Sequence, residues 1–122
     1  MITLVALVAG GLGAVTRFVV DGEVARRWRR SFPAGTFLVN VTGSLIIGIL
    51  AGAVMYHGRS ADWQTVLGTG FCGGYTTFST ASVETVRLFR SGRYAVAALN
   101  AVGSLVASMA ACALGLAAAW AL

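Results

Sequence analysis

One stretch limits the fold of this chain more than any other, the segment from Gly68 to Glu84, which reads GTGFCGGYTTFSTASVE. It lies inside an apolar run long enough to cross a bilayer, yet its four glycines each weaken a helix by roughly 1 kcal/mol relative to alanine. Hydroxyl residues follow the glycines: Thr76, Thr77, Ser79, Thr80 and Ser82. Because unpaired backbone groups are costly in hydrocarbon, a broken helix requires cover from protein or a water-filled path. We therefore predict a helix that unwinds near mid-membrane and exposes carbonyls and hydroxyls to a small solute.

The composition identifies the bilayer as the solvent of the chain. Of its 122 residues, 57% are hydrophobic and 11% are charged, whereas soluble domains average about 25% charged. The net charge of +5 comes from nine arginines that lie mainly between apolar runs, which indicates membrane topology rather than nucleic-acid binding. Cys72, Cys112 and the single His57 form no metal-ligand spacing, and no nucleophile–base pair indicates an enzyme.

Four apolar segments predict an all-α integral membrane protein made of one domain, residues 1–122. The expected transmembrane helices cover residues 2–20, 34–56, 63–89 with a break near 73–77, and 94–121. The first is not a signal peptide, because no basic residue precedes it and Arg17 lies inside its far end. Residues 21–31 are expected to form a polar loop. Small residues predict close helix packing at these positions: Gly10, Gly11, Gly13, Gly48 and Gly52.

The arginines predict one orientation in the cell (inner) membrane. Loops one and three share a side and carry seven arginines: Arg26, Arg27, Arg29, Arg30, Arg87, Arg90 and Arg93. Loop two, on the side of both termini, carries only Arg59. Because positively charged loops remain in the cytoplasm, we expect loops one and three inside and both termini outside.

Neutral hydrogen-bond donors recur inside the membrane segments. Thr36, Asn40 and Ser44 share one helical face, and the last segment carries polar residues four apart: Asn100, Ser104, Ser108 and Cys112. A cation pathway usually contains an intramembrane carboxylate, whereas OH and NH groups suit a small, strongly hydrated anion. Asn40 has an alternative interpretation, an interhelical hydrogen bond that holds the bundle together.

Phe78 and Glu84, beside the break, each have a functional and a purely structural interpretation. The ring edge of Phe78 is electropositive and can face an anion, although core packing also explains a single phenylalanine. Glu84 lies three residues before Arg87, so a local ion pair is sufficient to explain it.

Three motifs, in order, resemble the small fluoride-channel family called Fluc or CrcB over nearly the whole chain. They are GGLGAVTRF at 10–18, FPAGTFLVNVTGSLIIG at 32–48 and GFCGGYTTFSTASVE at 70–84, of which the last is the most specific. The resemblance implies a channel that lets fluoride leave the cytoplasm passively and so lowers its toxicity. It also implies an antiparallel dimer with two narrow pores.

The resemblance further implies roles for individual residues. Asn40 matches the pore asparagine, Phe78 the first of two phenylalanines whose ring edges line the pore, and Ser104 a serine lining it from the last helix. The other residues expected on the fluoride pathway are Thr36, Thr77, Ser79, Thr80 and Glu84. Arg17 matches the arginine that ends the first helix. Backbone carbonyls of Gly73 and Thr76 fall where both subunits hold one structural sodium ion, which is not transported.

The sequence departs from the family pattern at two positions. Ala81 replaces the second phenylalanine of TTFSTF, and Asn100 stands where many members have a pore tyrosine. A homodimer would then have two incomplete pores, and a fixed orientation opposes antiparallel self-pairing. We therefore expect a dimer with a related second chain rather than a homodimer, with fluoride and membrane lipid as the other partners and no nucleic acid.

Two alternative functions remain open at this point. Ala81 is also compatible with a non-conducting or half-pore subunit that supports the pore of a partner. A small four-helix multidrug exporter has the right size, but it needs a membrane-centred carboxylate in its first helix, and residues 2–20 contain none.

Overall fold

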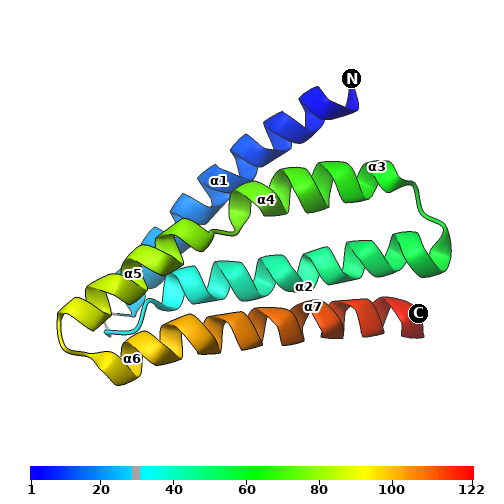
Figure 1. Ribbon diagram of the computed structural model, residues 1–122. Coiled ribbons are helices and arrows are strands. Elements are labelled where there is room, and N and C mark those ends of the chain that lie inside the picture. The colour runs from blue at the N-terminus through cyan, green and yellow to red at the C-terminus, as the bar shows by residue number, and fades with distance from the viewer. Residues whose placement is uncertain (29–30) are drawn as a thin grey trace.

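The computed structural model describes residues 1–28 and 31–122, and the regular structure in these two ranges is entirely helical (Figure 1). The first two helices are α1 (Ile2–Arg27) and α2 (Ala34–His57). The third segment consists of α3 (Ala61–Trp63), the π-helix η1 (Gln64–Cys72), α4 (Gly73–Tyr75) and α5 (Phe78–Arg90). The last consists of α6 (Tyr94–Ala98), the π-helix η2 (Leu99–Gly103) and α7 (Ser104–Ala121).

Within residues 1–28 and 31–122, three helical segments are long and apolar enough, by length and composition, to cross a membrane. They are Ile2–Arg27, Ala34–His57 and Tyr94–Ala121. The third segment of the chain is apolar as well, but its break leaves pieces that are each too short to span a bilayer. An integral membrane α protein follows from these spans.

The chain runs back and forth between two ends of the molecule (Figure 1). Both termini and the turn between α2 and α3 lie toward one end, and the end of α1, the start of α2 and the α5–α6 connection lie toward the other. α2 packs along α7, whereas α1 packs mainly on η1 and α4. α5 packs instead mainly on α6 and η2, so the two halves of the third segment have different neighbours.

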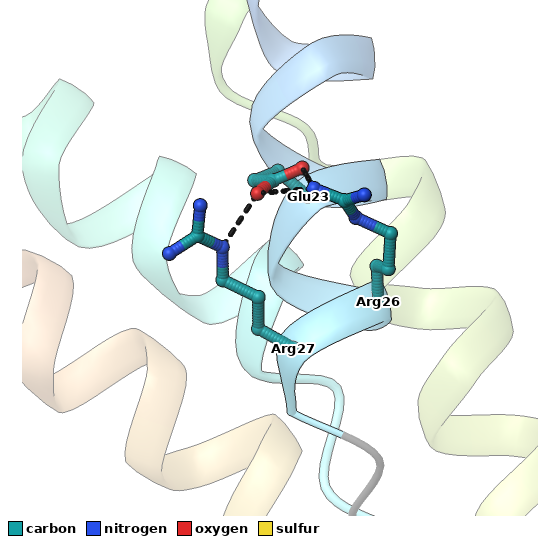
Figure 2. A network of polar contacts seen from close by, with 3 residues as sticks. All are labelled: Glu23, Arg26 and Arg27. Carbon is teal, nitrogen blue, oxygen red and sulfur yellow. Dashed lines mark hydrogen bonds and ion pairs between the residues drawn. The ribbon is translucent and has the colours of Figure 1, made fainter.

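The first helix is longer than the sequence predicted, because α1 continues through the expected polar loop as far as Arg27. Glu23 forms ion pairs with Arg26 at i+3 (2.8 Å) and with Arg27 at i+4, as Figure 2 shows. Pairs at these spacings stabilise a helix that has left the membrane and lost its apolar support. Arg29 and Arg30, which contributed to the predicted orientation, lie outside the described residues.

Glycines bring the backbones of neighbouring helices together. A Cβ on Gly13 would overlap the Phe71 carbonyl and lie 2.9 Å from the Tyr75 nitrogen, and one on Gly70 would lie 2.6 Å from the Ala6 carbonyl. Gly48 and Gly52 meet α7 in the same way, which confirms the predicted packing pair. The prediction was wrong for Gly11, since the space around it is open.

The break in the third segment lies at Thr76 and Thr77, inside the predicted range. Thr76 (φ −79°, ψ 160°) and Thr77 (φ −151°, ψ 122°) are extended, and α5 begins at Phe78. The preceding glycines do not themselves unwind, because Gly73 and Gly74 remain in α4. Gly74 instead packs against the Gly10 backbone of α1. The glycines therefore let the helical segment before the break lie close to α1, and they do not form the break itself.

Candidate functional site

The side chain of Asn40 in α2 pairs with both backbone groups of Thr77. Its Nδ2 donates to the Thr77 carbonyl at 2.9 Å, and its Oδ1 accepts from the Thr77 N–H at 2.7 Å. The Thr77 N–H lost its helical partner where the chain unwinds, and in an apolar setting it would be costly without a replacement. The Thr77 carbonyl, at the N-cap of α5, accepts Asn40 in addition to the first bond of that helix. Asn40 therefore holds the break and lies beside it, so the interhelical bond proposed from sequence exists.

Arg17 reaches the break from the opposite side. Its Nη1 donates to the Thr76 carbonyl at 3.1 Å, across 59 residues of chain. An arginine so deep in an apolar helix requires a partner, and a bared carbonyl is a suitable one. The two unwound residues are thus fixed by side chains from two different helices.

Hydroxyls cap the helix that follows the break. Thr77 is the N-cap of α5, and its Oγ1 accepts from the Thr80 N–H at 3.2 Å. The same oxygen also pairs with the hydroxyls of Ser79 at 3.3 Å and Thr80 at 3.1 Å. A capping threonine before a helix explains why α5 resumes at once.

A groove of about 570 Å³ runs between the break, α5 and the last helical segment. It brings together distant polar residues and Phe78, whose side chain is 89% exposed. Among the predicted residues, those lining the groove are Asn40, Thr76, Thr77, Phe78, Ala81, Asn100 and Ser104. Ser44 and Ser108 line it as well. The groove is open along one side and carries hydrogen-bonding groups that are electrically neutral.

A second, smaller cavity of about 340 Å³ lies on the other side of the break. Its polar lining includes Arg17, Asp21, Thr36, Thr77 and Thr80. Thr77 lines both spaces and is itself 7% exposed, so it is the residue through which they adjoin. Ser79 lines neither space and contacts the site only through Thr77.

The structural alternative for Glu84, a local ion pair with Arg87, is not found among the described residues. In the described part of the chain, the ion pairs belong to Glu23, and Glu84 Oε1 instead accepts a hydrogen bond from Thr36 Oγ1 at 2.9 Å. Glu84 Oε2 is buried and has no partner among the described residues. The α2–α5 contact prevails because Thr36, only 2% exposed, needs an acceptor, whereas the exposed Arg87 can remain hydrated.

The backbone around the break is compatible in part with a hard cation. In the described residues, no donor reaches the carbonyl of Gly73, since the Thr77 N–H that would normally do so is bound to Asn40. The Thr76 carbonyl has a second lone pair besides the one that Arg17 uses. No group of three or more His, Cys, Asp or Glu side chains is found within 1–28 and 31–122, so a metal here would depend on the main chain.

The sequence analysis did not single out Asp21 and Thr85. Asp21 lines the smaller cavity and lies four residues after Arg17 on the same helix. The sequence prediction ended this helix at residue 20, so it did not place Asp21 and Arg17 on one helical face. Thr85 lines the groove and donates to the Ala81 carbonyl at 2.8 Å. Its position four residues after Ala81 on the same helix face was the available signal.

Comparison with known proteins matches residues 4–116 to the family model described as CrcB-like protein, Camphor Resistance (CrcB). A protein of Leifsonia xyli named fluoride-specific ion channel FluC 1 is 47% identical over 116 residues, 95% of this chain and 85% of the relative. FluC 2 of Cutibacterium acnes is 48% identical over 110 residues, with 89% of each chain covered. FluC 2 of Rhodococcus jostii is 49% identical over 120 residues, 98% of this chain and 94% of the relative.

Proposed function

Because this chain belongs to the CrcB-like family, we propose that it is a fluoride-selective channel, not an enzyme, through which fluoride leaves the cytoplasm passively. The observation that carries the proposal is the broken helix, whose polar residues separate two spaces, the groove and the smaller cavity, around Thr77. Neutral hydroxyl and amide donors there can replace the water of a small anion without binding it too tightly to leave. The multidrug exporter is not favoured.

The proposed path follows the polar residues past the break. From the groove, fluoride passes Ser104, Asn40 and the ring edge of Phe78, and then reaches Thr77, Ser79 and Thr80. Thr36 and Glu84 lie at the far end of this track, joined by their hydrogen bond. Arg17 draws the anion toward the break, since an arginine facing a small polar cavity raises the local anion concentration.

We propose that the broken segment is a fourth crossing, with loops one and three in the cytoplasm and both termini outside the cell membrane. Its path between the same two ends as α2 supports this topology (Figure 1). Arg26 and Arg27 at the end of α1 and Arg90 at the end of α5 support the orientation, while Arg59 follows α2 at the other end. Such an asymmetry fixes which loops stay inside.

We propose an antiparallel dimer with a related second chain. Phe78 and the polar residues of the groove are open on one side, and a partner subunit can supply the cover that lipid does not give to polar groups. Ala81 supplies no second ring, and the arginine asymmetry opposes insertion of this chain in both directions.

At the centre of the dimer, the carbonyls of Gly73 and Thr76 would hold a structural sodium ion, which supplies positive charge where the bared carbonyls meet.

The decisive experiment is fluoride efflux from liposomes containing this chain alone, or this chain co-expressed with a relative of the same organism. A fluoride electrode follows the release, valinomycin dissipates the potassium gradient, and chloride-loaded vesicles are the control. We expect rapid fluoride release without chloride release for the mixed pair, and weaker release when N-methylglucamine replaces sodium throughout. Absence of fluoride release from liposomes that contain the pair would contradict the proposed channel. Full fluoride release by this chain alone would contradict the need for a second chain.

A further inference from the structure

The inference concerns Asn100, which lies in the π-helix η2 and is only 1% exposed. Its Nδ2 donates to the Ala81 carbonyl at 3.2 Å and to Thr85 Oγ1 at 2.9 Å, both in α5. Its Oδ1 accepts from Ser104 Oγ at 3.4 Å. All three polar positions of a buried amide are thereby used, and two of them tie α5 to the last helical segment.

The Thr85 hydroxyl completes the connection. It donates to the Ala81 carbonyl at 2.8 Å while accepting from Asn100, so the three groups form a closed set of hydrogen bonds. Within the described residues, these are the side-chain hydrogen bonds that join α5 to the last segment. The remaining polar ties of α5 and its N-cap lead to α2, through Asn40 and Thr36.

The surroundings of α5 make this connection important. α5 packs mainly on α6 and η2, and residues on its other faces are exposed, including Val83 and Val86. The extended residues before α5 are held by Arg17 and Asn40, so they fix only the first end of the helix. The bonds of Asn100 hold α5 further along, at Ala81 and Thr85. A π-turn is wider than an α-turn, and such turns recur where a helix must present one side chain out of register.

We infer that Asn100 is a positioning residue: together with Thr85 it sets the rotation of α5 and so the place of Phe78 along the groove. The inference rests on the proposed function only in its second part, the effect on fluoride. Asn100 does not itself need to touch the ion, because its amide is fully used by α5 and Ser104. Its effect on the path is transmitted through the helix that carries Phe78.

The test uses hydrogen exchange of this chain, co-expressed with the relative, in nanodiscs. Fluoride efflux is measured from liposomes that contain the same purified pair. Thr85→Val removes the hydroxyl at nearly constant volume, Thr85→Ser retains it, and Asn100→Leu removes the amide. Thr16→Val is the matched control, because Thr16 makes the same i−4 backbone bond at 2.8 Å but has no partner on another helix.

We expect Thr85→Val and Asn100→Leu to raise exchange in residues 78–90 by about three- to tenfold, the change that one net hydrogen bond produces, and to leave residues 34–57 unchanged. Fluoride efflux should fall in both, and Thr85→Ser and Thr16→Val should behave as wild type. Unchanged exchange in 78–90, an equal rise in 34–57, or loss of assembly in Thr85→Val would each overturn the inference. Local loosening of α5 with wild-type efflux would overturn its effect on fluoride. A wild-type pair that releases no fluoride would count against the proposed function and leave the exchange result valid.

Discussion

Asn40 and Thr77 form a two-way hydrogen-bonded pair, in which the amide side chain donates to the Thr77 carbonyl at 2.9 Å and accepts from the Thr77 N–H at 2.7 Å. The pair makes the break a defined structure rather than a loosened helix. It also places a polar side chain at the point where the groove and the smaller cavity adjoin.

Replacing Asn40 should therefore affect both the break and the flux. Asn40→Asp retains the acceptor for the Thr77 N–H but loses the donor to its carbonyl. Asn40→Ala also leaves the buried Thr77 N–H unpaired, which costs about 1–3 kcal/mol. We expect fluoride efflux to fall at least tenfold in Asn40→Asp and Asn40→Ala. Leu38→Ala on the exposed face of α2 is the control. Wild-type efflux in both Asn40 variants would remove this residue from the pathway.

Phe78 should be needed for conduction but not for folding of the single chain. Its ring is 89% exposed, so Phe78→Leu removes the electropositive ring edge without opening a cavity in the chain. We expect efflux to drop at least tenfold while gel filtration still shows the assembled dimer. Phe89→Leu, an exposed phenylalanine of the same helix, is the matched control. Equal efflux in Phe78→Leu and Phe89→Leu would show that the ring has no special role.

Gly13 should tolerate no side chain, whereas Gly11 on the same helix should accept one. A Cβ on Gly13 would overlap the Phe71 carbonyl, and the space around Gly11 is open. We expect Gly13→Ala to lower the apparent melting temperature in detergent by several degrees or to prevent assembly, because backbone must move on one side. Gly11→Ala should melt as wild type does. Similar melting of the two variants would contradict the close approach of α1 and η1.

The partner of Glu84 can be tested by removing each candidate partner in turn. Thr36→Val deletes the hydroxyl that donates to Glu84 Oε1 and leaves a carboxylate without any partner in the described residues, so we expect destabilisation by about 1–3 kcal/mol. Arg87→Gln should stay within about 0.5 kcal/mol of wild type, as exposed changes usually do. Thermal unfolding measures both, and a larger destabilisation by Arg87→Gln than by Thr36→Val would instead support the ion pair with Arg87.

Glu84→Gln separates the charge from the hydrogen bond. An amide oxygen can still accept from Thr36, so we expect the stability of the dimer to be retained. We expect fluoride efflux to decrease, because the substitution removes the charge of a residue on the proposed pathway whose Oε2 has no partner among the described residues. Unchanged efflux would assign Glu84 a structural role alone.

The sequence by itself determined the solvent, the helical class and the position of the break. Apolar runs of membrane length and a cluster of glycines followed by hydroxyls are local properties, and the bilayer permits few other ways to satisfy their backbone. The spacing of Thr36, Asn40 and Ser44 also predicted a shared face, because helical periodicity depends only on the chain itself.

Only the tertiary structure decided which partner each polar group takes. Asn40 could have bonded to any helix, Glu84 had Arg87 nearby in sequence yet bonds to Thr36, and Arg17 reaches a carbonyl 59 residues away. Asn100 gained its connection to Ala81 and Thr85 only when α5 turned toward η2. Such choices depend on which helices lie side by side. That arrangement follows from glycine contacts and burial summed over the whole bundle, which no local pattern contains.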